Sequence, residues 1–363
     1  MSFPLSYCPN GHARLARLRS LYEQRVQDRI FAIMEVPARA IERFAETHDA
    51  GYGARPDPDE RAAFWDELLR ERMAVDDDSI PCAYLSELDQ GVYGGIVGGK
   101  VQYMAHPDNG WISSMVPPIL TDWSGFDALR IDTEGDQYVY FLRLMERLRA
   151  GSSGKYGISH FILIDGLNFV FELFGATRTY LELGDNPDKV RQTIDFAFRL
   201  NVQVQQAFFE HIPLLEGGTC SNMAGWIPGR IVSESVDPFH MTSVDYFERW
   251  GREPVERIYA VFDGGVLHLH GNGRHLAPAI ASLRGLKAVL LNNDRGYPQV
   301  VTQLHKIKPR TGDLPLIVDV AYDDFVAAFE AHSLVGGAMY KVRHVPDIGT
   351  ANRWMEKVRD YRV

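Results

Sequence analysis

The sequence contains few cysteines, and their spacing pairs none of them. Only Cys8, Cys82 and Cys220 occur in 363 residues, far apart and without a Cys-x-x-Cys pair. This pattern predicts reduced thiols and argues against a disulfide framework or a thiolate zinc knuckle. Cys220, in the stretch GGTCSN, is a weak candidate nucleophile because no base partner for it can be identified in the sequence.

Long apolar runs and an excess of positive charge are also missing. No run of about 18 apolar residues occurs, and the stretch MSFPLSYCPNGHARLARLRS lacks the basic-then-apolar layout of a secretory signal. The formal net charge is -10 at pH 7, so the overall field does not favour binding to nucleic acid or anionic membranes. We therefore expect a cytoplasmic globular protein with neither a nucleic-acid nor a membrane partner.

The first part of the chain has the pattern of charge-dense helices. Its helix-like stretches are RLARLRSLYEQRVQDRIFAIM, PARAIERFAETHD and, after a Pro-rich break, DERAAFWDELLRERM. Such segments usually form a solvated cap, and we assign no chemistry to them. The sequence predicts a helical N-terminal extension over residues 1–78, packed on a larger domain over residues 79–363.

From about residue 155 the pattern changes to short apolar runs that alternate with amphipathic segments. The strand-like runs are ISHFILID (158–165), PLLEGG (213–218), VLHLHG (266–271), KAVLLNND (287–294), LPLIVDV (314–320) and GGAMYKV (336–342). Strands that alternate with helices indicate a parallel sheet buried on both faces. Either an open doubly wound sheet or a closed barrel fits this pattern. No GxGxxG follows the first strand, which disfavours a dinucleotide fold and favours a (β/α)8 barrel.

The stretch HLHGNGRHL holds a pair of histidines separated by one residue. Strand alternation places His268 and His270 on one face, near the end of the strand at Gly271. In α/β barrels this end carries the active site, and two such imidazoles are able to chelate one divalent metal. In the alternative interpretation one histidine is a core residue and the other contacts substrate. His275 begins the next helix-like segment, where it would bind an anion or be solvated.

Four segments resemble the uroporphyrinogen decarboxylase superfamily, which includes decarboxylases and corrinoid-linked methyltransferases. They are LGDNPDKVRQTI, IVSESVDPFHMTSVDYFERWGREPVERI, VLHLHGNGRHL and MYKVRHVPDIGTANRWMEKVRDY. The resemblance runs from about Pro81 to the C-terminus and is strongest from Ser159. VLHLHGNGRHL is similar to the His-x-Cys-Gly-Asn stretch of the methyltransferase branch. The arginine-rich motif of true decarboxylases is not recognisable, and EVPARAIERF is its nearest candidate.

The resemblance also implies a metal site. Where the zinc-dependent branch has His-x-Cys…Cys, this chain has His268-x-His270…His344. The resemblance therefore implies that His268, His270 and His344 bind one divalent metal, with zinc the first choice. The competing interpretation makes His344 a substrate hydrogen-bond donor, like the decarboxylase histidine.

Further polar residues fall at expected strand ends or in the loops above them. Glu234, Glu216 and Asp165 are candidate catalytic carboxylates that would complete a metal shell, orient a ligand or act as acid or base. Each is equally interpretable as an ion-pair partner or a turn cap. The candidate substrate-binding residues are Asn168, Trp226, Asn272, Arg274 and Asn293, with Asp294 as an alternative to Asn293 and Trp111 as a second aromatic candidate.

Three classes of function remain open. The first is a metal-dependent methyltransferase that acts on a small substrate, with a corrinoid on a separate partner protein. The second is a metal-free decarboxylase or related lyase that acts on a small carboxylate. The third, a non-catalytic binding subunit, is disfavoured because burying polar groups at several strand ends without a use is costly. The family resemblance also suggests a homodimer.

Overall fold

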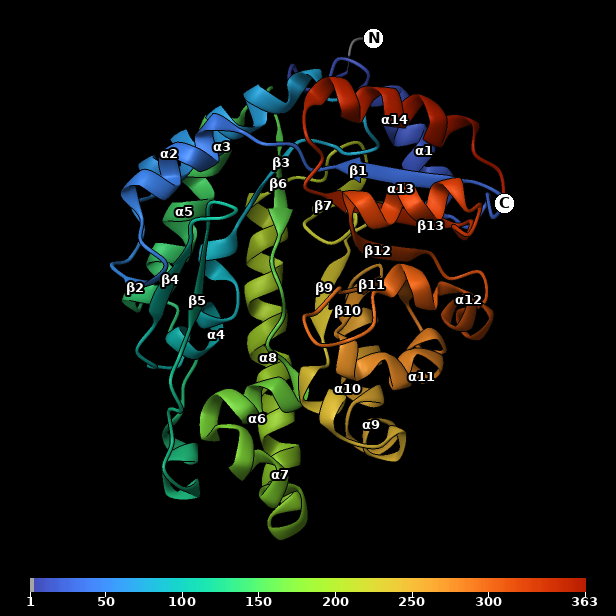
Figure 1. Ribbon diagram of the computed structural model, residues 1–363. Helices are drawn as coiled ribbons and strands as arrows, with labels where there is room; N and C mark the ends of the chain where they lie inside the picture. The colour runs from blue at the N-terminus through green and yellow to red at the C-terminus, as the bar shows by residue number, and fades with distance from the viewer. Residues whose placement is uncertain (1–2) are drawn as a thin grey trace.

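The computed structural model describes residues 3–363 and consists of alternating strands and helices (Figure 1). The strands are β1 (Ile30–Met34), β2 (Gly51–Gly53), β3 (Cys82–Tyr84), β4 (Gln102–His106), β5 (Trp111–Met115), β6 (Gly157–His160), β7 (Gly218–Ser221), β8 (Gly225–Pro228), β9 (Val232–Ser235), β10 (Gly265–Leu269), β11 (Leu286–Leu291), β12 (Leu316–Ala321) and β13 (Ala338–Arg343).

The helices connect these strands and cover them from outside. The α-helices are α1 (Gly11–Tyr22), α2 (Arg39–Thr47), α3 (Pro58–Glu71), α4 (Gly91–Ile96), α5 (Asp136–Ser152), α6 (Gly166–Phe174), α7 (Ala176–Asp185), α8 (Pro187–His211), α9 (Val244–Trp250), α10 (Arg252–Tyr259), α11 (Ala277–Ala281), α12 (Val300–Thr311), α13 (Tyr322–Glu330) and α14 (Ile348–Asp360). Short 3-10 helices are η1 (Arg72–Ala74), η2 (Ser86–Leu88), η3 (Trp123–Ala128), η4 (Asp237–Met241) and η5 (Gly271–Leu276).

The largest sheet has six parallel strands in the order β1-β13-β12-β11-β10-β9. Its strands are buried on both faces, because alternate residues belong to two different apolar clusters. On β13, for example, Tyr340 and Val342 pack in the larger cluster with the surrounding helices. Met339 instead packs in the smaller cluster, together with residues of α1 and β8. The α/β fold with a parallel sheet, as the sequence predicted, is confirmed.

A second sheet has the order β3-β6-β7-β8, in which β8 alone runs antiparallel to its neighbour. Two sets of contacts join it to the six-stranded sheet. Just after β6, the Leu163 N–H donates to the Ser233 carbonyl of β9 at 2.9 Å. Before β3, the Asp78 N–H donates to the Ala32 carbonyl of β1 at 2.9 Å, and the Asp78 carboxylate accepts from the Ala32 N–H at 3.0 Å. A third sheet, β2-β4-β5, is antiparallel and lies to the side, at the left of Figure 1.

Two predicted elements differ from the structure. The stretch IFAIM was placed in a helix of a purely helical extension over residues 1–78, but it forms β1, a fully buried strand that pairs with β13. Five consecutive apolar residues suit a strand between two neighbours better than one stripe of a surface helix. PLLEGG (213–218) was predicted as a strand, but only Gly218 of it belongs to one, β7. Among the described residues, no helix is long and apolar enough to cross a membrane.

Candidate metal centre

His268 and His270 lie at the end of β10, His268 within the strand and His270 directly after it, as the alternation predicted. β9 is the neighbour of β10, and His268 lies opposite Ser235 in the register. The chain continues from Ser235 into η4, whose first residue is Asp237. This connection carries the Asp237 carboxylate to the same end of the sheet as His268 and His270.

Asp237 Oδ1 lies between the imidazoles. It is 3.2 Å from His268 Nε2 and 3.9 Å from His270 Nε2. One ligand atom from each of the three residues lies within 4.8 Å of the other two. The His268 and His270 rings are perpendicular, with centroids 5.1 Å apart, so their nitrogens approach the carboxylate from different directions. Two imidazoles and one carboxylate form the donor set of a three-ligand metal site.

The hydrogen bonding of this cluster is incomplete. Within residues 3–363, Asp237 Oδ1 is buried and has no partner in hydrogen-bonding geometry, although nitrogens surround it. Buried polar atoms nearly always have a hydrogen-bond partner. A buried carboxylate oxygen without one, facing two imidazole nitrogens, therefore indicates that the carboxylate and the two imidazoles bind a common ligand. A divalent cation fits this description.

The charges in the cluster are strongly coupled. Burial opposes ionisation of Asp237, but His268, His240 and His270 together outweigh it and hold the pKa of the carboxyl well below its usual range. Burial would lower the pKa of His268, but the negative charge of Asp237, 3.2 Å away, outweighs this effect and raises that pKa. Asp237 is therefore a carboxylate, which is the form that ligates metals.

A second carboxylate holds one of the histidines in place. Asp294, just after β11, accepts a hydrogen bond from His270 Nδ1 at 3.0 Å and another from the Gly271 N–H at 2.6 Å. The hydrogen bond at Nδ1 leaves His270 Nε2 as the free ligand atom. This carboxylate–histidine arrangement is typical of metal sites, where it fixes the ring and raises its basicity.

We expect Asp294→Ala to weaken the affinity for a divalent metal by about 10–100-fold, the usual effect of losing such a partner. The reason is that the His270 ring would lose both its fixed orientation and its preferred tautomer. Competition with a fluorescent chelator measures the affinity. Asp324→Ala, on helix α13 and outside the group of Asp237, His268 and His270, is the matched control. An unchanged affinity in Asp294→Ala would contradict the assigned role.

Sequence reasoning missed two members of this cluster. Asp237 and His240 both lie in η4, in the quoted segment IVSESVDPFHM, but neither was singled out. His240 Nδ1 is 3.4 Å from Asp237 Oδ1, and burial lowers the pKa of His240 to about 4. The available signal was a carboxylate directly after a buried strand end, followed three residues later by a histidine.

His344, the expected third ligand, is not part of the candidate metal-binding group of Asp237, His268 and His270. It is exposed after β13, in the left-handed region of backbone conformation at φ 61. The structure brings Asp237, not His344, to the pair His268 and His270.

The three predicted catalytic carboxylates have different surroundings. Asp165 and Glu234 are both buried, and their carboxyl groups interact with each other. Burial raises the pKa of Asp165 to about 6, and burial together with the Asp165 charge raises that of Glu234 well above its usual range. Glu216 is exposed and precedes β7 instead of following a strand, so it lies away from this end of the sheet.

Most of the predicted substrate-binding residues have structural contacts. Arg274 donates to the carbonyls of Pro298 and Asn292, and Asn293 accepts from the Val300 N–H at the start of α12. The Asn272 carbonyl contacts the His275 ring. Trp226 is fully buried, with its Nε1–H donating to the Leu215 carbonyl.

Asn168 is the predicted substrate-binding residue that borders a cavity near the metal centre. The cavity has a volume of about 370 Å³, and Asp237 and Ser235 line it as well. The Asn168 side chain donates to the Ser235 carbonyl at 2.6 Å, which joins α6 to the end of β9. Most of the remaining lining is apolar and includes Phe171 and Met241. The cavity therefore lies next to the candidate metal-binding group, with Asp237 belonging to both.

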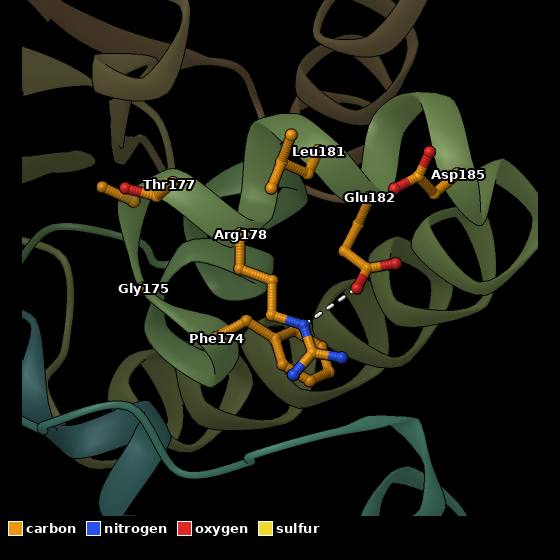
Figure 2. A pocket seen from close by; sticks show the side chains of 8 residues that line it. Phe174, Gly175, Thr177, Arg178, Leu181, Glu182 and Asp185 are labelled. Atoms are coloured by element: carbon orange, nitrogen blue, oxygen red, sulfur yellow. Dashed lines mark hydrogen bonds and ion pairs between the residues drawn. The ribbon is translucent and has the colours of Figure 1, made fainter.

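A second hollow, of about 500 Å³, lies over α7 (Figure 2). Two of its charged groups, Arg178 and Glu182, already have partners. Arg178 Nε donates to Glu182 Oε1 at 2.8 Å, the contact drawn in Figure 2, and Trp123 Nε1 donates to Glu182 Oε2 at 2.7 Å. This hollow holds no predicted site residue.

Comparison with solved structures relates this chain to known proteins by its fold. No protein-family model matches this sequence, and no curated protein is similar to it in sequence. Among solved structures, the chain is similar to a methyltransferase from Methanosarcina mazei, with a TM-score of 0.59 and 14% sequence identity. The similarity covers 96% of this chain and 97% of the other. The two proteins therefore share a fold over nearly their whole length.

Proposed function

We propose that this protein is a divalent-metal enzyme of the uroporphyrinogen decarboxylase superfamily. In this proposal it transfers a methyl group between a small substrate and a corrinoid carried by a separate protein. The observation that carries the proposal is the group Asp237, His268 and His270, next to a cavity, in a chain whose fold resembles that of a methyltransferase.

The proposed architecture is a (β/α)8 barrel. Eight parallel strands are available for it: β1, β3, β6, β9, β10, β11, β12 and β13. The Leu163–Ser233 and Ala32–Asp78 contacts support closure, because they link the second sheet to both edge strands of the first. The barrel then begins at β1, earlier than the boundary at residue 79, and the metal centre lies at the carboxyl ends of its strands, where barrel enzymes act.

The residues present fit a metal. His268 Nε2, His270 Nε2 and Asp237 Oδ1 would hold it, and the orphaned state of Asp237 Oδ1 supports this assignment. A bound zinc or similar ion supplies Lewis acidity that polarises the substrate atom bearing or accepting the methyl group. Asp237 and Asp294 together offset the two positive charges of such an ion. The nitrogen and oxygen donors form a harder site than the sulfur-containing shell of the family, which favours oxygen ligands in a substrate.

The alternative, a metal-free decarboxylase for a small carboxylate, has less support. A substrate carboxylate needs a cationic partner in the cavity. Within the described chain, none of the residues that line the cavity beside Asp237 is a lysine or arginine. Arg274, the candidate for that role, donates instead to two backbone carbonyls.

Two measurements on protein purified without a histidine tag test the proposal. Elemental analysis is expected to find about one divalent ion per chain, as for a single three-ligand site. The second follows the absorbance of cob(I)alamin with candidate methylated substrates. The reaction consumes cob(I)alamin, the methylated substrate and a proton, and forms methylcob(III)alamin and the demethylated substrate. Absence of both the ion and any protein-dependent methyl transfer would contradict the proposal.

A further inference from the structure

We infer that the cavity beside Asp237 binds a small, largely apolar ligand that carries a positive charge, and that Glu172 is the residue that pairs with this charge. The inference rests on the proposed function only in taking this cavity as the substrate site. It narrows the substrate to a class, small ammonium compounds.

Glu172 is a buried carboxyl group without partners. It lies on α6 and lines the cavity, and both carboxyl oxygens are buried. Within residues 3–363, neither oxygen has a hydrogen-bond partner of good geometry. Burial raises the pKa of Glu172 to about 8, and the nearby Gly94 N–H offsets this only in part. Such a group destabilises the empty protein, and carboxyl groups of this kind are concentrated at functional sites.

The backbone of α4 is shaped to accommodate this side chain. A Cβ atom on Gly94 would collide with Glu172 Oε1 and would lie 2.9 Å from Val116 Cγ2. A glycine at this position therefore leaves the room that the carboxyl group occupies. The side chain is thus held at the wall of the cavity by close packing, with no ion pair to hold it.

The charges around the cavity favour a cation. Its lining includes two acidic residues, Glu172 and Asp237, and among the described residues no basic one. The histidines, and a metal where one is bound, compensate the charge of Asp237. Glu172 remains as the uncompensated acid. A ligand cation would restore the ionised form of Glu172 and supply its missing partner, whereas an anion would meet no compensating charge.

The rest of the lining suits the body of such a ligand. Phe171 and Tyr180 provide aromatic rings, on which ammonium groups bind favourably. The Tyr180 hydroxyl donates to the Pro238 carbonyl at 2.7 Å, and the Asn168 amide donates to Ser235, so both polar groups are already committed. The volume of about 370 Å³ is near the lower end of the usual range for ligand sites, so the ligand is small.

Calorimetry with three matched probes tests the inference. The first probe is choline. The second is its neutral isostere, 3,3-dimethyl-1-butanol, in which a tert-butyl group replaces trimethylammonium. The third is the anion 3,3-dimethylbutanoate. Choline is expected to bind at least about tenfold more tightly than either of the others, as for a desolvated charge-assisted contact. Comparable binding of the isostere or the anion, or no binding of choline, would overturn the inference.

Two variants test whether Glu172 is the residue that binds the positive charge of the ligand. Glu172→Gln is expected to weaken choline binding by about tenfold or more and to leave binding of the neutral isostere within about twofold. Glu146→Gln, an exposed position on α5, makes the same change in net charge and should alter neither affinity. An unchanged choline affinity in Glu172→Gln would show that another group recognises the charge. The comparison of probes on the unsubstituted protein stands even if the variant does not fold.

The same titrations on chelator-treated protein separate this inference from the proposed function. A preference for choline in protein that never contains a metal supports the cation site and counts against the metal enzyme. A metal-containing protein with no preference for choline sustains the proposed function and overturns the cation site.

Discussion

Replacing His268 with alanine is expected to remove bound metal almost completely. His268 is buried, and its Nε2 is the nitrogen nearest to Asp237 Oδ1. Loss of a direct ligand should lower metal affinity by more than about 100-fold, since loss of a supporting residue alone costs about 10–100-fold. Asp237→Ala should have a similar effect, because it removes the anionic donor. Metal content after dialysis, measured by elemental analysis, checks both variants.

His344→Ala is the informative control for this prediction. His344 is exposed and lies outside the group formed by Asp237, His268 and His270, so its loss should leave metal content unchanged. If His344→Ala loses as much metal as His268→Ala, Asp237 is not the third ligand. Circular dichroism should show the same fold in all variants, because a core of this extent does not depend on one polar side chain.

Glu172→Gln is expected to change how the stability of the ligand-free protein depends on pH. The pKa of Glu172 is raised from the usual 4.5 to about 8, so the folded state keeps a proton that the unfolded state loses between these values. This group therefore destabilises the protein progressively as pH rises through that window, and the loss does not occur below it. We expect the unsubstituted protein to lose roughly 3–4 kcal/mol more stability than Glu172→Gln between about pH 5 and about pH 8.

Urea unfolding at both pH values measures this difference. The quantity compared is the change in unfolding free energy between the two pH values, in each protein. The titration of every group that the two proteins share cancels in this comparison. The cost of burying an amide in the variant cancels as well, because it does not depend on pH. Glu146→Gln should follow the unsubstituted protein at both pH values, since Glu146 is exposed. Parallel pH profiles for Glu172→Gln and the unsubstituted protein would show that the Glu172 carboxyl is not buried as described.

Local patterns in the sequence determined several features. Alternation in VLHLHG placed His268 and His270 on one face of a strand end, because side chains of a strand point to opposite sides in turn. Pro187 is the first residue of α8, a position that suits proline because of its fixed φ and missing N–H. Repeated strand–helix alternation predicted the parallel sheet. These features depend on neighbours in the chain, so the sequence alone contains them.

Contacts between distant segments were decided only by the tertiary structure. IFAIM became β1 because β13, more than 300 residues later, provides its hydrogen-bonding partner. Asp237 reaches the histidines because β9 lies beside β10, a pairing that no local pattern specifies. Glu172 resembles an ordinary helical glutamate in the sequence, and only the packing of α6 against α4 buries its carboxyl group. Burial and ligand geometry arise from which elements become neighbours, and that choice minimises the free energy of the whole chain and not of any one segment.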